Sequence, residues 1–231
     1  MKILNLGNKF DTSNVTDMNN MFASCGKREL ENIYFGNEVG TQYEIVFANS
    51  FNTSAVTDMN NMFNSFGWKK IKKLDLGENF DTSNVTDMRN MFQYAGYELM
   101  ENLDLGEKFN TVKVNKMEGM FNLTGHATLK SLDLGDKFDT TNVTNMSSMF
   151  EGTGQTAMTS LDLGDKFYTT SATNMTNMFA YCGTTSMTVL DLGPAFTKIA
   201  ETNTDMFKSC GTTDLKIYAP ESIYSNRITF K

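Results

Sequence analysis

The stretch LDLGENFDTSNVTDMRNMFQYAG, which runs from Leu74 to Gly96, contains every element of a pattern that recurs along this 231-residue chain. Nine of its letters, FDTSNVTDM, occur unchanged at residues 10–18 and 80–88. A Met-Phe doublet marks each recurrence, at steps of 41, 29, 29, 29, 29 and 28 residues: Phe22, Phe63, Phe92, Phe121, Phe150, Phe179 and Phe207. A fixed period of this length is typical of stacked structural units, so we predict a single repeat domain over residues 1–231.

Each unit contains a strand pattern followed by a helix pattern. The LDLG segment places apolar residues at alternate positions and ends in glycine, which predicts a short strand with two side chains pointing inward. The apolar spacing of three, three and four from Val143 through Met146 to Met149 and Phe150 favours a short helix, and the preceding threonines and asparagines are residues that cap helices. We therefore predict an α/β solenoid of about seven repeats of 29 residues, with a parallel sheet of short strands on one face and short helices on the other.

The apolar pattern also predicts how the units are stabilised. An apolar residue lies eight positions beyond each repeat phenylalanine, and together with the strand it gives the leucine-rich-repeat spacing L-x-x-L-x-L. Full burial of each inward side chain stabilises a fold by about 1.5–3 kcal/mol, but only neighbouring coils can cover both faces of a coil. We therefore expect no single repeat to fold alone.

Two segments depart from the repeat. Twelve extra residues interrupt the second unit, in the segment 37–50, which contains the aromatic residues Tyr43 and Phe47. Insertions of this kind often lie on a binding face, but this one equally suits a cover over one end of the apolar stack. The tail at residues 221–231 is expected to leave the stack and to shield its last coil.

Composition limits the functions that the chain can have. It is 40% hydrophobic and 20% charged, with a net charge of −7, so its surface should repel nucleic acid unless basic residues are concentrated locally. The densest cationic run, WKKIKK at residues 68–73, is typical of a solvated turn. Nowhere does the sequence approach the roughly 18 consecutive apolar residues that span a bilayer, so we expect no direct membrane insertion.

The units LDLGDKFDTTNVTNMSSMFEGTG (residues 132–154) and LDLGDKFYTTSATNMTNMFAYCG (residues 161–183) resemble the repeats of BspA-like leucine-rich-repeat bacterial surface proteins. The resemblance is to the variant with the segment F-x-T-S-N-V-T-x-M-x-x-M-F, and it covers about residues 3 to 220. It implies a cell-surface or secreted protein that takes part in adhesion or recognition, with a protein or glycan partner that can come from a host. It carries over no catalytic residues.

The outward position of the strand segment is the strongest candidate binding site. In a parallel stack, its residues would form a column with a spacing of about 4.8 Å, and like charges at that distance repel by about 1 kcal/mol in water. Three interpretations remain open: screening by water and by Lys73, Lys130 and Lys137; a binding stripe for a cationic or hydroxyl-rich partner; or a calcium site, which would need further oxygen ligands. The column consists of Asn5, Tyr34, Asp75, Asp104, Asp133, Asp162 and Asp191.

The remaining reactive residues favour packing over chemistry. Cys25, Cys182 and Cys210 share the position three residues beyond the repeat phenylalanine, where other units have Ala, Thr or Phe, which indicates a packing position. A disulfide between Cys182 and Cys210 would require Cα atoms within about 7 Å. His126 is the only histidine and is expected in a surface turn. We predict no cofactor and no enzymatic activity, because the repeat assembles no set of unlike catalytic groups.

Two functional hypotheses follow from these observations. The first is a non-enzymatic recognition or adhesion module that binds a protein or glycan through a concave strand face, with Tyr34 and the aspartates, or through the insertion, with Tyr43 and Phe47. The second is a passive spacer that projects another domain from a cell surface. The chain opens directly on a strand segment, so we also expect an exposed apolar end and end-to-end self-association.

Overall fold

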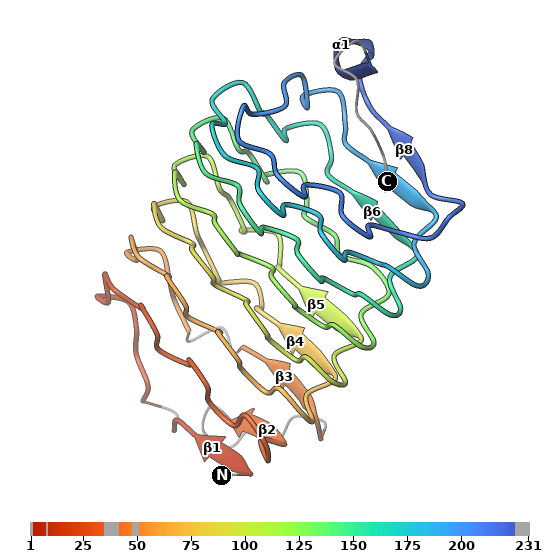
Figure 1. Cartoon of the computed structure of the whole chain (residues 1–231). Coiled ribbons are helices and arrows are strands. Elements are labelled where there is room, and N and C mark those ends of the chain that lie inside the picture. Colours follow the sequence, from red (N-terminus) through yellow and green to blue (C-terminus); the bar gives the residue numbers. More distant parts are fainter. Residues whose placement is uncertain (1, 8, 35–41, 48–50, 225–231) are drawn as a thin grey trace.

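The chain forms a parallel β-solenoid, seen in a computed structural model that describes residues 2–7, 9–34, 42–47 and 51–224 (Figure 1). Most coils contribute one short strand to one side of the stack, and successive coils lie side by side along its axis. The three-residue strands are β1 (Ile3–Asn5), β2 (Asn32–Tyr34), β3 (Glu44–Val46), β4 (Lys73–Asp75), β5 (Asn102–Asp104), β6 (Ser160–Asp162), β7 (Val189–Asp191) and β8 (Lys216–Tyr218).

The strands pair in parallel and in the register that the repeat predicts. Leu74 of β4 lies opposite Leu103 of β5, and Leu161 of β6 lies opposite Leu190 of β7. The strands form three sheets, β1-β2, β3-β4-β5 and β6-β7-β8. The segment at residues 131–133, between β5 and β6, is not a strand, although its Leu132 is buried like the other leucines of this column. The expected stacking of consecutive 29-residue units is therefore confirmed.

The predicted helices are wrong. The segment after each strand is a run of turns, and α1 (Glu221–Tyr224) is the only helix in the part of the chain that the structure describes. In the third coil, every second amide donates a hydrogen bond to a carbonyl of the next coil. These bonds measure 2.8–3.0 Å and start from Met88, Asn90, Phe92 and Tyr94. The amides between them donate three residues back, as Met91 does to the carbonyl of Met88 at 3.2 Å. We call this hydrogen-bonded side of the stack the turn ladder.

The backbone conformation of the turn ladder excludes a helix. Asn90 has a φ of +53° and Tyr94 a φ of +58°, which places both in the left-handed region, and their counterparts in the other coils do the same. A turn closed from residue i+3 to residue i with positive φ at residue i+2 is a type II turn, which asparagine and glycine tolerate best. The apolar spacing of three that favoured a helix fits successive turns equally well, because both place every third or fourth side chain inward.

The core is a continuous column of apolar side chains between the sheet and the turn ladder. The phenylalanines of the Met-Phe doublets stack almost parallel, with centroids 5.5 Å apart between Phe63 and Phe92 and again between Phe92 and Phe121. Met88, Met91 and their repeat counterparts are fully buried in the inner coils. The regularly spaced methionines therefore form part of the core there.

Buried threonines link the coils in a second polar ladder. Thr111 is fully buried; its Oγ1 donates to the carbonyl of Asp139 in the next coil at 2.8 Å and accepts from the Asp139 amide at 2.7 Å. Thr53, Thr82 and Thr140 make the same donation to the coil that follows each of them. These hydroxyl groups therefore bridge coils instead of capping helices, which was their expected role.

The insertion supplies an additional strand. Ile45 of β3 lies opposite Leu74 of β4, so β3 occupies the place of the repeat strand, while β2 keeps its 29-residue register with β1. The turn ladder runs directly from Asp17 to Asp58 to Asp87, so the strand side has one strand more than the ladder side at this point. Residues 42–47 therefore continue the stack between β2 and β4 and do not cover an end of it. The rest of the segment 37–50 lies outside the described residues.

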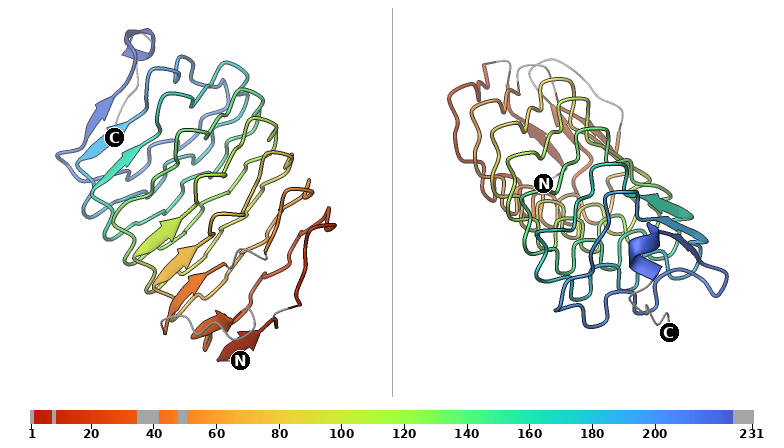
Figure 2. Two further views of the ribbon diagram at one scale, coloured as in Figure 1. Left: turned by 180° about the vertical axis from the view of Figure 1, so that it is seen from behind. Right: turned by 90° about the horizontal axis from the view of Figure 1, so that it is seen from above.

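The helix α1 lies at the C-terminal end of the solenoid, beyond β8 (Figure 2). Its Ile223 is fully buried and belongs to the main apolar cluster. This contact agrees with the expected shielding of the last coil by the tail. The remainder of the tail, residues 225–231, lies outside the described residues.

The threonine ladder gives the first testable prediction. Thr111→Val keeps the shape of the side chain but leaves the Asp139 amide without its partner in a buried site, and we expect a loss of about 1–3 kcal/mol in the free energy of unfolding. Thr86→Val is the matched control, because the Thr86 hydroxyl lies on the exposed surface, and it should cost less than about 0.5 kcal/mol. Urea denaturation measures both values, and equal losses would contradict the structural role of the buried ladder.

Candidate functional site

The acidic column predicted from the sequence exists on the strand side. Asp75 lies opposite Asp104, and Asp162 lies opposite Asp191, with all four at the ends of their strands. The column has apolar and aromatic neighbours at its two ends. Val46 occupies the position next to Asp75 and is 48% exposed, and Tyr218 occupies the position next to Asp191 and is 50% exposed.

Each carboxylate has a local structural role. The Oδ1 atom of Asp104 accepts a hydrogen bond of 3.0 Å from the amide of Gly106, and the equivalent bonds in the other four coils measure 2.8–2.9 Å. Asn5 makes the same bond to the amide of Gly7 at 2.8 Å. The glycines have a φ near +70°, a backbone conformation that other residue types adopt only with strain. The side-chain oxygen therefore holds a turn that requires glycine.

Only one lysine pairs directly with the column among the described residues. The Nζ atom of Lys73 lies 3.0 Å from Oδ2 of Asp75. Lys137 donates instead to the carbonyl of Glu107, and Lys166 donates to the carbonyl of Asp136, each at 3.0 Å. Screening by lysine side chains is therefore established for Asp75, while Lys130 makes no ion pair within the described coils.

A groove lies beside the C-terminal half of the acidic column. It has a volume of about 680 Å³ and lies over the strand ends of three successive coils. Its walls combine apolar side chains such as Leu134, Phe138 and Pro194 with a single lysine, Lys166. Five carboxylates line the groove: Asp133, Asp136, Asp162, Asp165 and Asp191. We call it the acidic groove.

The acidic groove does not assemble a metal site from the described residues. No three histidine, cysteine, aspartate or glutamate side chains of the described coils come close enough together to hold a metal ion. Calcium needs six to eight oxygen ligands, which a single row of carboxylates does not supply. The calcium interpretation therefore has no support in the geometry, and the arrangement better suits extended contact with a cationic partner.

The three remaining candidate residues have different environments. Tyr34 ends β2 opposite Asn5 and is half-buried. Tyr43 is half-buried as well, and its amide donates to the carbonyl of Glu31 at 2.7 Å. Phe47 is only 2% exposed, and its ring lies 4.7 Å from that of Phe51. Phe47 therefore belongs to the core, and its predicted surface contact is corrected, because the strand β3 turns it inward.

The cysteines are packing residues, as expected. All three are free thiols, and Cys182 is fully buried. Burial raises the pKa of Cys182 well above its usual value and raises the pKa of Cys210 to about 12. A thiol with a raised pKa is a poor nucleophile, which is consistent with a packing role for Cys182 and Cys210.

The structure also brings together a cluster that the sequence reasoning missed. The ring of Trp68 lies 4.5 Å from that of Tyr97 and 5.1 Å from that of Tyr94, and Tyr97 lies 4.3 Å from His126. All four rings are half-buried. The Nζ atom of Lys27 lies 4.6 Å from the centroid of the Trp68 ring. We call Trp68, Tyr94, Tyr97 and His126 the aromatic stack.

A repeat alignment contains the signal for this stack. Lys27, Trp68, Tyr97 and His126 each follow the glycine that lies four residues past the repeat phenylalanine, so the solenoid places them in one row. Only this alignment shows that His126 shares a row with Trp68 and Tyr97. Its ring is packed against a neighbour, and burial lowers its pKa below the usual value despite a hydrogen bond with Gln155.

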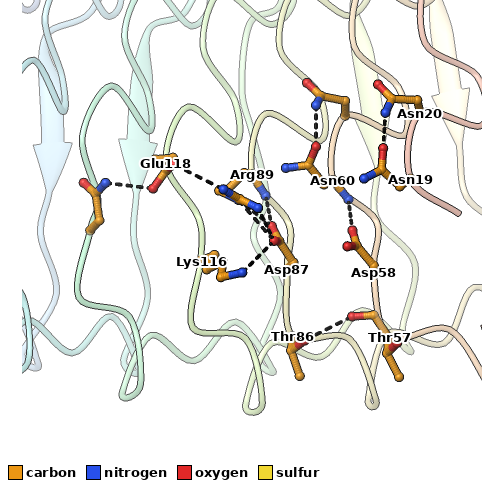
Figure 3. A network of polar contacts seen from close by, with 12 residues as sticks. Asn19, Asn20, Thr57, Asp58, Asn60, Thr86, Asp87, Arg89, Lys116 and Glu118 are labelled. Atoms are coloured by element: carbon orange, nitrogen blue, oxygen red, sulfur yellow. Dashed lines mark hydrogen bonds and ion pairs between the residues drawn. The ribbon is translucent and has the colours of Figure 1, made fainter. Parts of the chain in front are cut away.

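A charged network lies on the turn ladder. Arg89 makes a salt bridge of 2.6 Å to the carboxylate of Asp87, and Lys116 of the next coil lies 3.2 Å from the same oxygen (Figure 3). Arg89 also lies 3.9 Å from Glu118. Burial raises the pKa of Asp87, but hydrogen bonds from Arg89 and Lys116 outweigh it, so the pKa of this carboxyl lies below its usual value. These ion pairs therefore connect the coil that contains Asp87 and Arg89 with the coil that contains Lys116 and Glu118.

These features define a class of protein: a parallel β-solenoid built from repeats of 29 residues. The family model described as "Mycoplasma protein of unknown function, DUF285" matches residues 5–75, 65–191 and 97–218, so the chain belongs to this family. No curated protein and no solved structure matches the chain. In the described part of the chain, no helix has the length and apolar character needed to cross a membrane.

The Asp87 network gives a prediction about pH. Because the folded-state pKa is lowered, the charged carboxylate stabilises the fold above the unfolded-state pKa, and this contribution is lost as pH falls through the folded-state value. We expect Asp87→Asn to be less stable than the wild type at neutral pH and the difference to shrink below about pH 4. Urea denaturation across this range provides the measurement. A difference that stays constant with pH would contradict the assignment.

Proposed function

We propose that the chain is a non-enzymatic recognition module that binds a protein or glycan partner through the strand side, with the acidic groove as the contact site. Its resemblance to BspA-like leucine-rich-repeat surface proteins supports a setting at a cell surface or outside the cell. The family model carries no assigned function, so the proposal depends on the chemistry of the groove.

The observation that carries the proposal is a comparison within the column. Asn5 makes the same turn-closing hydrogen bond as the five aspartates, so the turn requires only a side-chain oxygen and not a negative charge. Like charges in adjacent coils repel by about 1 kcal/mol in water, and by more where water is partly excluded. A charge that the fold does not need, kept in five coils, indicates a role in contact with something positive.

The groove has the lining that lysine or arginine side chains favour. Such side chains lay their aliphatic stems along apolar surface and keep the charged head near water or a carboxylate. The exposed ring of Pro194 supplies apolar surface, with small contributions from the nearly buried Leu134 and Phe138, while Asp133, Asp162 and Asp191 supply a row of carboxylates along it. The Oδ1 atoms are engaged by glycine amides, which leaves the second oxygen of each carboxylate for a partner.

The proposal predicts that a short oligolysine peptide binds this face. Changing Asp133, Asp162 and Asp191 together to Asn removes three charges and keeps the turn-closing oxygens, so we expect binding to weaken at least about tenfold while the fold stays intact. Isothermal titration calorimetry measures the affinity, and circular dichroism checks the fold.

The matched control changes Asp75 and Asp104 to Asn, since both lie in the same column outside the groove. It should leave most of the binding intact. Absence of peptide binding to the wild type, or equal weakening by both variants, would reject the groove as the site. Unchanged binding by the triple variant would place the peptide contact outside the groove and leave the insertion or the passive spacer as the remaining hypotheses.

A further inference from the structure

The aromatic stack is a surface that the proposed binding groove leaves unexplained. Its rings belong to coils that precede the groove, and every ring is partly buried, so the exposed edges of the stacked rings form a row on the surface. Stacked tyrosine and tryptophan side chains lose little conformational freedom when they bind, and these residue types dominate the energy of protein interfaces. Leu99, two residues beyond Tyr97, adds an aliphatic side chain that is 40% exposed.

The surroundings of the stack are locally basic on a chain with a net charge of −7. Lys27 and Arg28 are exposed, and neither makes an ion pair with another described residue. Lys69, next to Trp68, pairs with Glu98 at 3.3 Å, where both side chains remain about half-exposed. Lys27, which lies over the Trp68 ring, and the next residue, Arg28, are therefore, among the described residues, two cations without a carboxylate partner at this end of the aromatic stack.

The acidic groove has the complementary composition. Five carboxylates line it against the single cation Lys166, and Pro194 supplies the exposed apolar surface. A row of partly buried rings with two cations at one end complements this lining chiefly in charge. The complementary surfaces lie on different coils of one rigid stack, residues 68–126 and residues 131–194.

We propose that the acidic groove of one copy of this chain binds the aromatic stack of a second copy, with Lys27 and Arg28 facing the groove carboxylates. This inference rests on the proposed function, because it names a partner for the same groove. Two different surfaces meet in this contact, so it is heterologous and does not close into a two-fold dimer. Each added copy leaves one free groove and one free stack, which extends the assembly into a chain.

The test measures self-association by sedimentation velocity across a wide range of protein concentrations. We expect the average mass of the wild type to rise with concentration. Lys27→Glu with Arg28→Glu removes the cations beside the stack, and the triple variant with Asn at positions 133, 162 and 191 removes the groove charges. Each variant should raise the dissociation constant at least about tenfold.

A mixture of the two variants gives the most discriminating result. Each retains the surface that the other lacks, so the mixture should form a one-to-one complex that does not grow further. Lys9→Glu with Lys216→Glu is the control, because it makes the same change in net charge at two exposed lysines away from the stack. This control should associate like the wild type.

Three outcomes overturn the inference: a monomeric wild type at all concentrations, association that survives both variants, or a mixture that does not combine. The oligolysine titration distinguishes failure of the self-association proposal from failure of the proposed function. If the groove binds the peptide but the chain stays monomeric, the recognition role stands. Only the second copy is then rejected as the partner.

Discussion

The structure depends on hydrogen bonds between the backbones of adjacent coils. Along the turn ladder, alternate amides donate to the next coil, as Met88 does to Lys116 and Met146 to Asn174, each at 2.9 Å. Buried backbone groups without partners are costly, so a coil is stable only beside neighbours that accept these bonds. The stacked phenylalanines impose the same requirement on the core, because each ring is covered by the rings of the coils before and after it. Polar and apolar groups therefore enforce one arrangement.

This double requirement explains what the sequence could predict. The 29-residue period fixes which residues meet, so the register of Leu74 with Leu103, the buried methionines and the acidic column were all predictable from spacing alone. The turns that replace the predicted helices were not predictable in this way, because an apolar spacing of three arises from successive type II turns as well as from a helix. The distinguishing signal was the recurrence of asparagine, serine and glycine at positions such as Asn90 and Gly119, where positive φ is needed. The inward turn of Phe47 was hidden because only pairing with β4 shows that the insertion contains a repeat strand.

The candidate sites divide according to how they relate to the repeat. The acidic column repeats with the fold and was found from the sequence, whereas the aromatic stack is confined to a few coils and becomes visible only when residues after equivalent glycines are aligned. Nearly identical coils carry a risk of pairing in the wrong order, and features confined to particular coils oppose it. Trp68 against Tyr97 and Asp87 against Lys116 each identify one neighbouring pair of coils. Stabilising the order of coils and presenting a surface are compatible roles for such residues.

Within the acidic column, the two oxygens of each aspartate have different surroundings. One oxygen of each aspartate accepts the glycine amide two residues on, which holds the turn whatever the charge of the side chain, as Asn5 demonstrates. The other oxygen carries charge to the surface without disturbing that bond. Because the turn is satisfied locally, the repulsion between neighbouring coils can be relieved by a cation from outside the chain as well as by a residue such as Lys73. A repeat protein can thereby change its surface charge coil by coil, since exchanging Asp for Asn removes a charge while the turn-closing hydrogen bond can stay the same, as at Asn5.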